Sequence, residues 1–301
     1  MVRMKGCLPV SVSLDINEKK LVFTSLEKEL WPGEGITKYN LIKYYLEVAP
    51  NLLPHLRGRF LVIQRFPNGI DKEGFYQKNI PAEAPSWIST APFRHGEKTT
   101  RYLLADGPET LAWLGNLACL EIHPWLSPVA NPDQPDFAVF DLDPAPGIPF
   151  SSVCRVALEL HRLMQKRDLR VYPKTSGASG IQVYLPLQPR YSYTESRDFC
   201  HNVFRELYRL LPRLTTMERS VARRGRKIYL DHLQNARGKT LVAPYSPRPL
   251  PGAPVSTPLE WHELSKASLH PSSFNILTIM PRLQARGDIF SPVLTDRQHL
   301  S

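Results

Sequence analysis

The sequence predicts an α/β (α+β) protein, and three observations support this fold class. Residues 137–231 show the order strand, helix, strand, strand, helix, strand, which is the order of a split β-α-β unit. The first helix of this unit has apolar residues at helical spacing along one face. A separate mixture of short strands and helices precedes it. We therefore expect an N-terminal α/β module at residues 1–130, packed with a ferredoxin/RRM-like palm at residues 131–301 as one compact domain.

The N-terminal module is expected to begin with a strand and a long helix. Thr37 is a suitable N-cap for this helix, whose buried face would include Leu41 and Tyr45. A Pro-Asn-Gly sequence predicts a turn between the two strands that follow. In chain order the predicted elements are a strand at Leu21–Phe23, a helix from Thr37 to about Leu53, strands at Leu61–Phe66 and Phe75–Gln77, and a helix at Leu111–Leu120.

The second module has the clearer pattern. Ser151 or Ser152 would cap a helix whose apolar residues up to Met164 share one face. From Gly238 onward, prolines alternate with apolar residues, which predicts a long ordered loop. The remaining predicted elements are strands at Phe137–Asp143, Leu169–Tyr172, Ile181–Leu185 and Lys227–Asp231, a glycine turn at Ser176–Gly180 and a helix from about Thr194 to Leu211. This unit occurs in nucleotide polymerases and RNA-recognition modules alike, so the fold alone selects no function.

Composition excludes several classes of protein. The 301 residues include 38 Lys+Arg and 28 Asp+Glu, giving a net charge of +10, and 42% are hydrophobic, which favours a folded basic protein. The four cysteines form no C-x-x-C pair, which argues against a disulfide framework or a zinc finger. Without a leader-like segment or a run of about 18 apolar residues, we expect a cytoplasmic (nucleoid) protein. The positive charge favours a polyanionic partner such as nucleic acid.

Three carboxylates are candidate metal ligands. Asp141 and Asp143 are two apart on a strand, so their side chains share a face, and a divalent cation would allow both to stay ionised. The alternative is that Asp-x-Asp-Pro is only a turn at the end of the strand. Asp231 ends the strand expected beside the first, and three carboxylates suit a two-metal phosphoryl-transfer site. In an antiparallel pair, however, the C-terminal ends of the two strands would not coincide.

Three other features have both a functional and a structural interpretation. The turn from Lys174 to Gly180 fails the Walker pattern, but its amides could hold a triphosphate; it could also be a plain hairpin turn. The basic run from Arg219 to Lys227 could bind an anion or be a solvated face. His123 could donate to phosphate or be a hydrogen-bonded core residue.

The combination of motifs resembles the polymerase domain of bacterial ligase D, of the archaeo-eukaryotic primase (primase-polymerase) superfamily. The resemblance extends over most of the chain, roughly residues 20 to 290. The matching segments are Asp141-Leu142-Asp143-Pro144, Lys174-Thr175-Ser176-Gly177-x-x-Gly180, Asp231-x-x-Gln234-Asn235, Ala243-Pro244-Tyr245-Ser246-x-Arg248 and Val255-Ser256-Thr257-Pro258-Leu259, and upstream Lys28, Gly35-Ile36-Thr37-Lys38, Arg65-Phe66-Pro67-Asn68-Gly69 and Gly74-Phe75-Tyr76-Gln77-Lys78.

The resemblance implies a primase-polymerase fold and a DNA-directed nucleotidyltransferase. Such an enzyme adds NTPs or dNTPs to primer 3′ ends at gaps and breaks in non-homologous end joining DNA repair. Asp141, Asp143 and Asp231 would be catalytic and would hold two Mn²⁺ (or Mg²⁺) ions. The nucleotide-binding residues would be His123, Ser176, Gln182, Arg224, Gln234 and Arg248, and the DNA-binding residues would be Lys28, Lys38, Arg65, Phe75, Tyr76 and Lys78.

The DNA-binding residues divide by role. Lys28 and Lys38 match lysines that hold the 5′-phosphate across a gap, and Phe75 and Tyr76 match aromatics that stack on template bases. The alternative for the two aromatics is a place in the core of a strand. Three positions depart from the family pattern: Gln182 replaces a histidine, Gln64 replaces a basic residue and Ser179 replaces a residue that is basic in some relatives.

The partners and competing functions follow from the same comparison of motifs. The chain has no ligase K-x-D-G motif, so we expect it to depend on a separate ATP-dependent DNA ligase and a Ku-like end-binding protein. Its DNA substrate would be gapped or broken DNA with a 5′-phosphate. The alternatives are a non-catalytic nucleic-acid-binding module and a metal-dependent nuclease.

Overall fold

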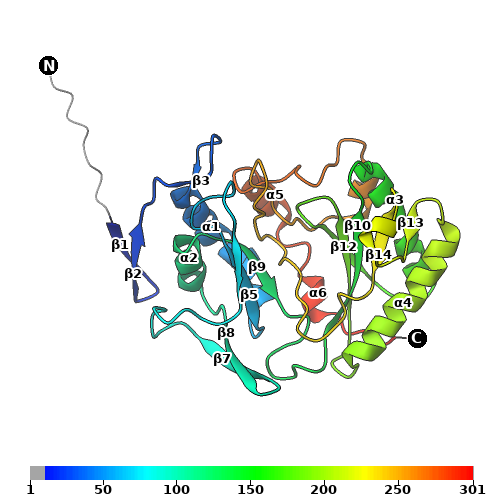
Figure 1. Cartoon of the computed structure of the whole chain (residues 1–301), viewed down its shortest axis with the longest axis horizontal. Coiled ribbons are helices and arrows are strands. Elements are labelled where there is room, and N and C mark those ends of the chain that lie inside the picture. Colours follow the sequence, from blue (N-terminus) through cyan, green and yellow to red (C-terminus); the bar gives the residue numbers. More distant parts are fainter. Residues whose placement is uncertain (1–10, 301) are drawn as a thin grey trace.

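The computed structural model describes residues 11–300 and places two modules side by side (Figure 1). The N-terminal module contains a sheet in which β5 (Leu61–Arg65) lies between β6 (Phe75–Gln77) and β8 (Lys98–Leu103) and also pairs with β9 (Cys119–Pro124). Its other elements are β1 (Ser11–Ile16), β2 (Lys19–Thr24), β3 (Glu29–Trp31), β4 (Ile36–Thr37), α1 (Lys38–Leu56), β7 (Thr90–His95) and α2 (Pro108–Asn116).

The long helix α1 confirms the sequence prediction for this region. Thr37 is its N-cap, and the Thr37 and Asn40 side chains form a capping box that satisfies backbone N–H groups at the start of the helix. The expected face, including Leu41 and Tyr45, is fully buried. The helix runs three residues beyond the expected end at Leu53.

The helix predicted at Leu111–Leu120 is wrong at its C-terminal end. The helix α2 ends at Asn116, Ala118 has a positive φ of 53°, and β9 begins at Cys119. The apolar residues run without a break through this boundary, so their pattern could not separate a buried helix from a buried strand. Pairing of β9 with β5 across the sheet decides the outcome.

The palm has the predicted β-α-β-β-α-β order. Its sheet has the strand order β11-β12-β10-β14, with a short edge strand added beside β14. These four strands are antiparallel to their neighbours, as in a ferredoxin-like unit. The elements are β10 (Phe137–Pro144), α3 (Phe150–Gln165), β11 (Tyr172–Thr175), β12 (Ile181–Pro186), α4 (Tyr193–Leu210), β13 (Thr215–Thr216), η1 (Val221–Arg223), β14 (Ile228–Asp231) and η2 (Trp261–Ser265).

Two boundaries in the palm differ from the prediction. The strand expected at Leu169–Tyr172 begins only at Tyr172, because the pairs with β12 run from Tyr172 to Thr175. Leu169 is buried, but it lies ahead of the sheet. The N-cap of α3 is Pro149 rather than Ser151 or Ser152, and its side chain makes no capping hydrogen bond.

The two faces of the palm sheet have different neighbours. Residues Leu142, Val183 and Leu230 pack with the apolar faces of α3 and α4 in one core cluster. The alternate residues, including Val139, project to the opposite face. Asp141 alternates with Leu142, so the carboxylates lie on the face away from the two helices.

The proline-rich segment after Gly238 is ordered, as predicted, and residues 241–247 and 253–259 within it are buried. It runs between the two modules (Figure 1) and ends in α5 (Ile279–Arg286) and α6 (Pro292–Thr295). Tyr245 and Val255 belong to the core of the N-terminal module. The division of the chain into modules at residue 130 stays a prediction. The proline-rich segment follows that point in the sequence but packs against the N-terminal module. No helix within residues 11–300 is long and apolar enough to cross a bilayer.

Candidate active site

The three aspartates lie on one face of the palm sheet, on the two neighbouring strands β10 and β14. Asp141 of β10 lies directly opposite Asp231 of β14, and Asp143 lies two residues further along β10. The expected conflict between antiparallel strand ends is absent because β10 continues three residues past Asp141, to Pro144. The end of β14 therefore meets the interior of β10. On its other side, Asp141 is opposite Gln182 of β12.

Burial and mutual repulsion raise the pKa of two of these acids, Asp141 and Asp143. Burial, followed by the charges of Asp231 and Asp143, raises the pKa of Asp141 to about 7. Burial also raises the pKa of Asp143, and the neighbouring Arg224 guanidinium opposes that shift. Asp231 is held by its local turn: its Oδ1 accepts from the Leu233 amide at 2.9 Å. A strongly perturbed acid such as Asp141 is typical of a functional site.

The donor set fits a hard divalent cation in its chemistry. All three candidate ligands are carboxylates, and a cation would relieve the repulsion between Asp141 and Asp231. Within residues 11–300, however, no three His, Cys, Asp or Glu side chains are placed to hold one ion together. Asp143 is exposed, and its Oδ2 lies 3.5 Å from Nη1 of Arg224. Joint ligation thus requires Asp143 to turn from Arg224 toward its two partners.

Arg224 is the one member of the basic run that reaches this site. Its guanidinium carbon lies 3.7 Å from the centre of the Tyr229 ring, a cation–π contact that orients it over β14. Backbone carbonyls of Glu218 and Arg219 accept its other N–H groups. Arg223 is exposed instead. The basic run thus combines both interpretations: Arg224 lies at the candidate active site, and Arg223 is part of a solvated face.

Gln234 also reaches the carboxylates. Its Nε2 donates to Oδ2 of Asp231 at 3.2 Å. The next residue, Asn235, is buried and bonds both to the backbone N–H and to the carbonyl of Val139, which ties the turn after β14 to β10. These two hydrogen bonds to β10 fix the point where β14 ends, and so hold Asp231 beside Asp141.

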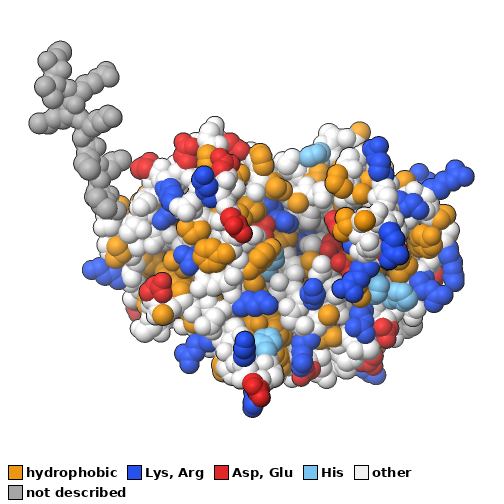
Figure 2. Space-filling model, viewed as in Figure 1, with side chains coloured by type: hydrophobic (Ala, Val, Ile, Leu, Met, Phe, Trp, Pro, Cys, Tyr) orange, Lys and Arg blue, Asp and Glu red, His pale blue; other side chains and the backbone are white. Residues whose placement is uncertain are grey.

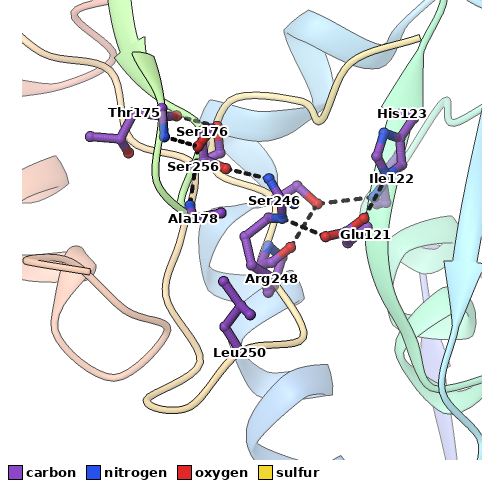
Figure 3. A network of polar contacts seen from close by, with 12 residues as sticks. Glu121, Ile122, His123, Thr175, Ser176, Ala178, Ser246, Arg248, Leu250 and Ser256 are labelled. Atoms are coloured by element: carbon purple, nitrogen blue, oxygen red, sulfur yellow. Dashed lines mark hydrogen bonds and ion pairs between the residues drawn. The ribbon is translucent and has the colours of Figure 1, made fainter. Parts of the chain in front are cut away.

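A polar network joins the palm to the N-terminal module (Figure 3). Glu121 of β9 lies between His123, at 2.8 Å, and the Arg248 guanidinium. Arg248 also donates from Nη1 to the Ser176 carbonyl oxygen. Burial alone would raise the pKa of Glu121, but hydrogen bonds and charge from His123 and Arg248 outweigh burial and hold that pKa below its ordinary value.

Sequence reasoning missed Glu121. The residue is 2% exposed within an apolar strand, and a buried acid two residues before a candidate phosphate ligand was the signal available. His123 combines its two expected interpretations. It is largely buried and hydrogen-bonded to Glu121, and it also borders the candidate site. The Tyr76 ring lies edge-on to the His123 ring at 5.7 Å.

The glycine turn is a tight hairpin connection between β11 and β12. Ser176 closes it, because its Oγ accepts from the amides of Ala178 and Gly180 at 3.2 and 3.0 Å. Gly177 has a φ of +73°, and a Cβ there would lie 2.7 Å from Cγ of Arg248. The turn therefore supports the Arg248 side chain by close backbone approach as well as by the Ser176 carbonyl.

Lys174 is a buried residue that the sequence analysis did not single out. It is fully inaccessible and lies opposite Gln182 in the sheet register. Burial and then the Arg248 charge lower the pKa of Lys174 well below its ordinary value, while Asp141 opposes them. Lys174, Gln182, Asp141 and Asp231 thus form one row across four strands.

The predicted 5′-phosphate residues are brought together on the N-terminal module. Burial, then the charges of Lys28 and Arg65, lower the pKa of Lys38. Its Nζ donates to the Thr24 carbonyl at 2.7 Å, and Lys28 donates to Asn68 at 3.1 Å. Within residues 11–300 no carboxylate forms an ion pair with any of these three cations, which leaves their charge available to an anion.

Phe75 and Tyr76 lie on the surface, and the alternative that they are core residues is wrong. They are 46% and 60% exposed, and Lys78 beside them is exposed as well. The guanidinium carbon of Arg65 lies 5.3 Å from the Phe75 ring centre. Figure 2 shows a hollow between the two modules with many Lys and Arg side chains on the surrounding surface.

Comparisons with known proteins agree with this architecture. The family model "LigD, primase-polymerase domain" matches residues 37–290. The LigD proteins of Bacillus subtilis and Mycolicibacterium smegmatis are 38% and 33% identical over 269 and 280 residues, which is 89% and 92% of this chain. The chain spans only 43% and 36% of those two relatives.

A solved structure gives the same result. The polymerase domain of Mycobacterium tuberculosis ligase D, solved in complex with DNA, matches 92% of this chain and 99% of its own length, with a TM-score of 0.85 and 30% identity. The primase-polymerase fold predicted from the motifs is therefore confirmed. On the match of the family model and the agreement of sequence and structure, the chain belongs to the LigD primase-polymerase domain family.

Proposed function

We propose that the chain is a DNA-directed primase-polymerase that adds NTPs or dNTPs to primer 3′ ends at gaps and breaks during non-homologous end joining. The observation on which this rests is the opposition of Asp141 and Asp231 across two paired strands, with Asp143 on the same face. Neighbouring acids repel one another and raise the pKa of Asp141. A bound cation would relieve this repulsion, which supports a site for a metal ion and a phosphate chain.

The three aspartates would hold two Mn²⁺ or Mg²⁺ ions. When bound, these ions would supply charge neutralisation at the triphosphate and a lower pKa for the primer 3′-hydroxyl. Arg224, stacked on Tyr229, is positioned to bind phosphate oxygens once it leaves Asp143. Arg248, held between Glu121 and the Ser176 carbonyl, would bind them from the proline-rich segment.

Four further side chains would complete the nucleotide site. His123 and Gln182 border it as hydrogen-bonding groups, one beside Glu121 and one beside Asp141. Gln234 and Ser176 lie at the turns that end β14 and β11. Because Gln182 carries no ionisable proton, it would orient its partner by hydrogen bonding alone.

The DNA would lie across the N-terminal module. The cluster of Lys28, Lys38 and Arg65 would take the 5′-phosphate, and the exposed rings of Phe75 and Tyr76 would stack on template bases. Lys78 would contact the backbone. Its partners in end joining would be a Ku-like end-binding protein and an ATP-dependent DNA ligase activity.

One assay separates this function from its competitors. The full chain is incubated with Mn²⁺, labelled nucleotides and a gapped duplex carrying a 5′-phosphate and a labelled primer. A polymerase lengthens the primer, a binding module only shifts its mobility, and a nuclease shortens it. Asp231→Asn serves as the matched control, because it keeps the size of the side chain and removes its charge. A primer of unchanged length with the wild-type chain refutes the proposal.

A further inference from the structure

Lys174 is an unusual residue to find at the centre of the palm. Its side chain is fully buried, and within residues 11–300 no carboxylate oxygen lies within ion-pairing distance of its Nζ. Burying an ammonium group without an ionic partner is costly. An apolar side chain of similar length would fill the same space at lower cost, so packing alone does not account for a lysine here.

The hydrogen bonds of Lys174 are made to two neutral oxygens. Its Nζ donates to Oε1 of Gln182 and to Oγ of Ser256, both at 2.6 Å. The Ser256 hydroxyl in turn donates to the Thr175 carbonyl, so its oxygen is an acceptor toward Lys174. An amine has at least two N–H groups in either protonation state, so both bonds hold whether Lys174 is charged or neutral.

These bonds determine which way the Gln182 amide points. The atom that faces Nζ is the amide oxygen, which accepts from it, so the amide nitrogen and its N–H groups face the other way. That direction is toward Asp141, because Asp141 lies opposite Gln182 in the adjacent strand, on the side away from Lys174. The Gln182 side chain also acts to lower the pKa of Asp141, as a hydrogen-bond donor to its carboxylate would. Without Lys174, the amide could rotate by half a turn and present its oxygen to the carboxylate.

We propose that Lys174 is a positioning residue for the candidate active site. It fixes the Gln182 amide, and the amide N–H fixes the carboxylate of Asp141 in the orientation that its metal-binding role needs. The inference rests on the proposed function, since it takes Asp141 as a ligand. It extends that function to a residue that touches neither nucleotide nor cation and acts through a partner across the sheet.

The test is a double-mutant cycle in the full-length chain with Mn²⁺ alone as the probe. Free Mn²⁺ is measured by its electron paramagnetic resonance signal, with no DNA or nucleotide present. Lys174→Met and Gln182→Ala should each weaken Mn²⁺ binding about 10-fold, the range for residues that orient a metal ligand. Because both act through one hydrogen bond, the double variant should be no more than about two-fold weaker than either. Independent, multiplying losses overturn the proposal.

Two further variants separate positioning from charge and from folding. Lys174→Gln keeps a donor to Gln182 without the charge, and should bind Mn²⁺ nearly as well as wild type. Ser256→Ala removes the other bond of Lys174, of equal length, and should leave the affinity within about two-fold. If Lys174→Met fails to fold, a folded Lys174→Gln that loses about 10-fold still overturns the proposal.

The outcomes also distinguish this inference from the proposed function. A wild-type chain that does not bind Mn²⁺ contradicts the metal site itself, and with it the role given to Lys174. A wild-type chain that binds Mn²⁺ and extends primers, but shows no coupling between Lys174 and Gln182, leaves the polymerase intact and refutes the positioning role alone.

Discussion

Asp141 and Asp231 face each other directly in the antiparallel register of β10 and β14. Placing two carboxylates opposite one another on the same face of a sheet destabilises the strand pair, because like charges at that separation repel. The palm keeps the pair despite this cost, at the point where the end of one strand meets the interior of the other. Removing either charge should therefore have opposite effects on stability and on activity.

The first prediction concerns activity. Asp141→Ala and Asp231→Ala should each reduce nucleotide addition to less than about one hundredth of wild type, because losing a ligand should cost at least as much as losing a residue that orients one. DNA binding, measured by mobility shift, and the circular dichroism spectrum should stay close to wild type. Primer extension retained in either folded variant would show that these carboxylates are not the site.

The second prediction concerns stability against pH in the presence of a chelator. The pKa of Asp141 rises from 3.8 to about 7 on folding, so between these values the folded state binds more protons than the unfolded state. Stability should therefore fall as the pH rises through this window. The melting temperature of Asp141→Asn should lack this decline between about pH 4 and 7. If the melting temperatures of wild type and Asp141→Asn change with pH in the same way, the raised pKa of Asp141 is contradicted.

The third prediction concerns Glu121, which joins the modules. Glu121→Gln should lower the free energy of unfolding at pH 7 by about 1–3 kcal/mol, because Arg248 loses its buried partner. The pKa of Glu121 is lowered on folding, so its stabilising contribution is present above 4.5 and is lost as the pH falls through the folded value. Urea unfolding of wild type and variant should therefore converge below pH 4.5. A gap that widens in acid would refute this role.

The fourth prediction concerns the 5′-phosphate. Lys28→Met should abolish the preference for a 5′-phosphorylated gapped duplex over an unphosphorylated one, a loss of about 10-fold or more for a charge-assisted hydrogen bond. Lys43→Met is the matched control, since Lys43 is an exposed lysine of α1 that pairs with Glu47. Fluorescence anisotropy with both duplexes gives the comparison. Equal loss in the two variants would indicate general charge attraction only.

The fifth prediction concerns the exposed aromatic rings. Tyr76→Ala should weaken binding of a single-stranded template by about 1–3 kcal/mol, the usual value for one stacked base. Its thermal stability should hardly change, since the ring is 60% exposed. Tyr39→Ala, which removes a tyrosine of similar exposure on α1, is the control and should bind as wild type does. Unaltered template affinity in Tyr76→Ala would exclude stacking there.

The sequence predicted the palm well because its signals are local. The helical spacing up to Met164 and the acids that end two apolar strands can be recognised without knowing their partners. The boundary of α2 was missed because one apolar run enters both a helix and a strand. Likewise, whether Asp231 would reach Asp141 depended on how far β10 continues, which only the register of the sheet decides.

The residues that sequence reasoning missed share a property. Glu121 and Lys174 are buried ionisable groups, and each has one partner that is distant in the chain: Arg248 lies 127 residues from Glu121, and Ser256 lies 82 residues from Lys174. Each is inconspicuous in its own strand, and its role depends on a partner from another segment: Arg248 for Glu121 and Gln182 of the adjacent strand for Lys174. A pattern within one strand gives no sign of such pairing, because the pairing is a property of the tertiary structure.

The return of the proline-rich segment across the module boundary has a consequence for unfolding. Tyr245 and Val255 are part of the N-terminal core, while Arg248 between them bonds to the palm at Ser176. Opening either module would pull this segment away and separate Arg248 from Glu121 and Ser176, which border the proposed nucleotide site. The two modules should thus exchange their amide protons as one cooperative unit, with no half-folded form that keeps this arrangement.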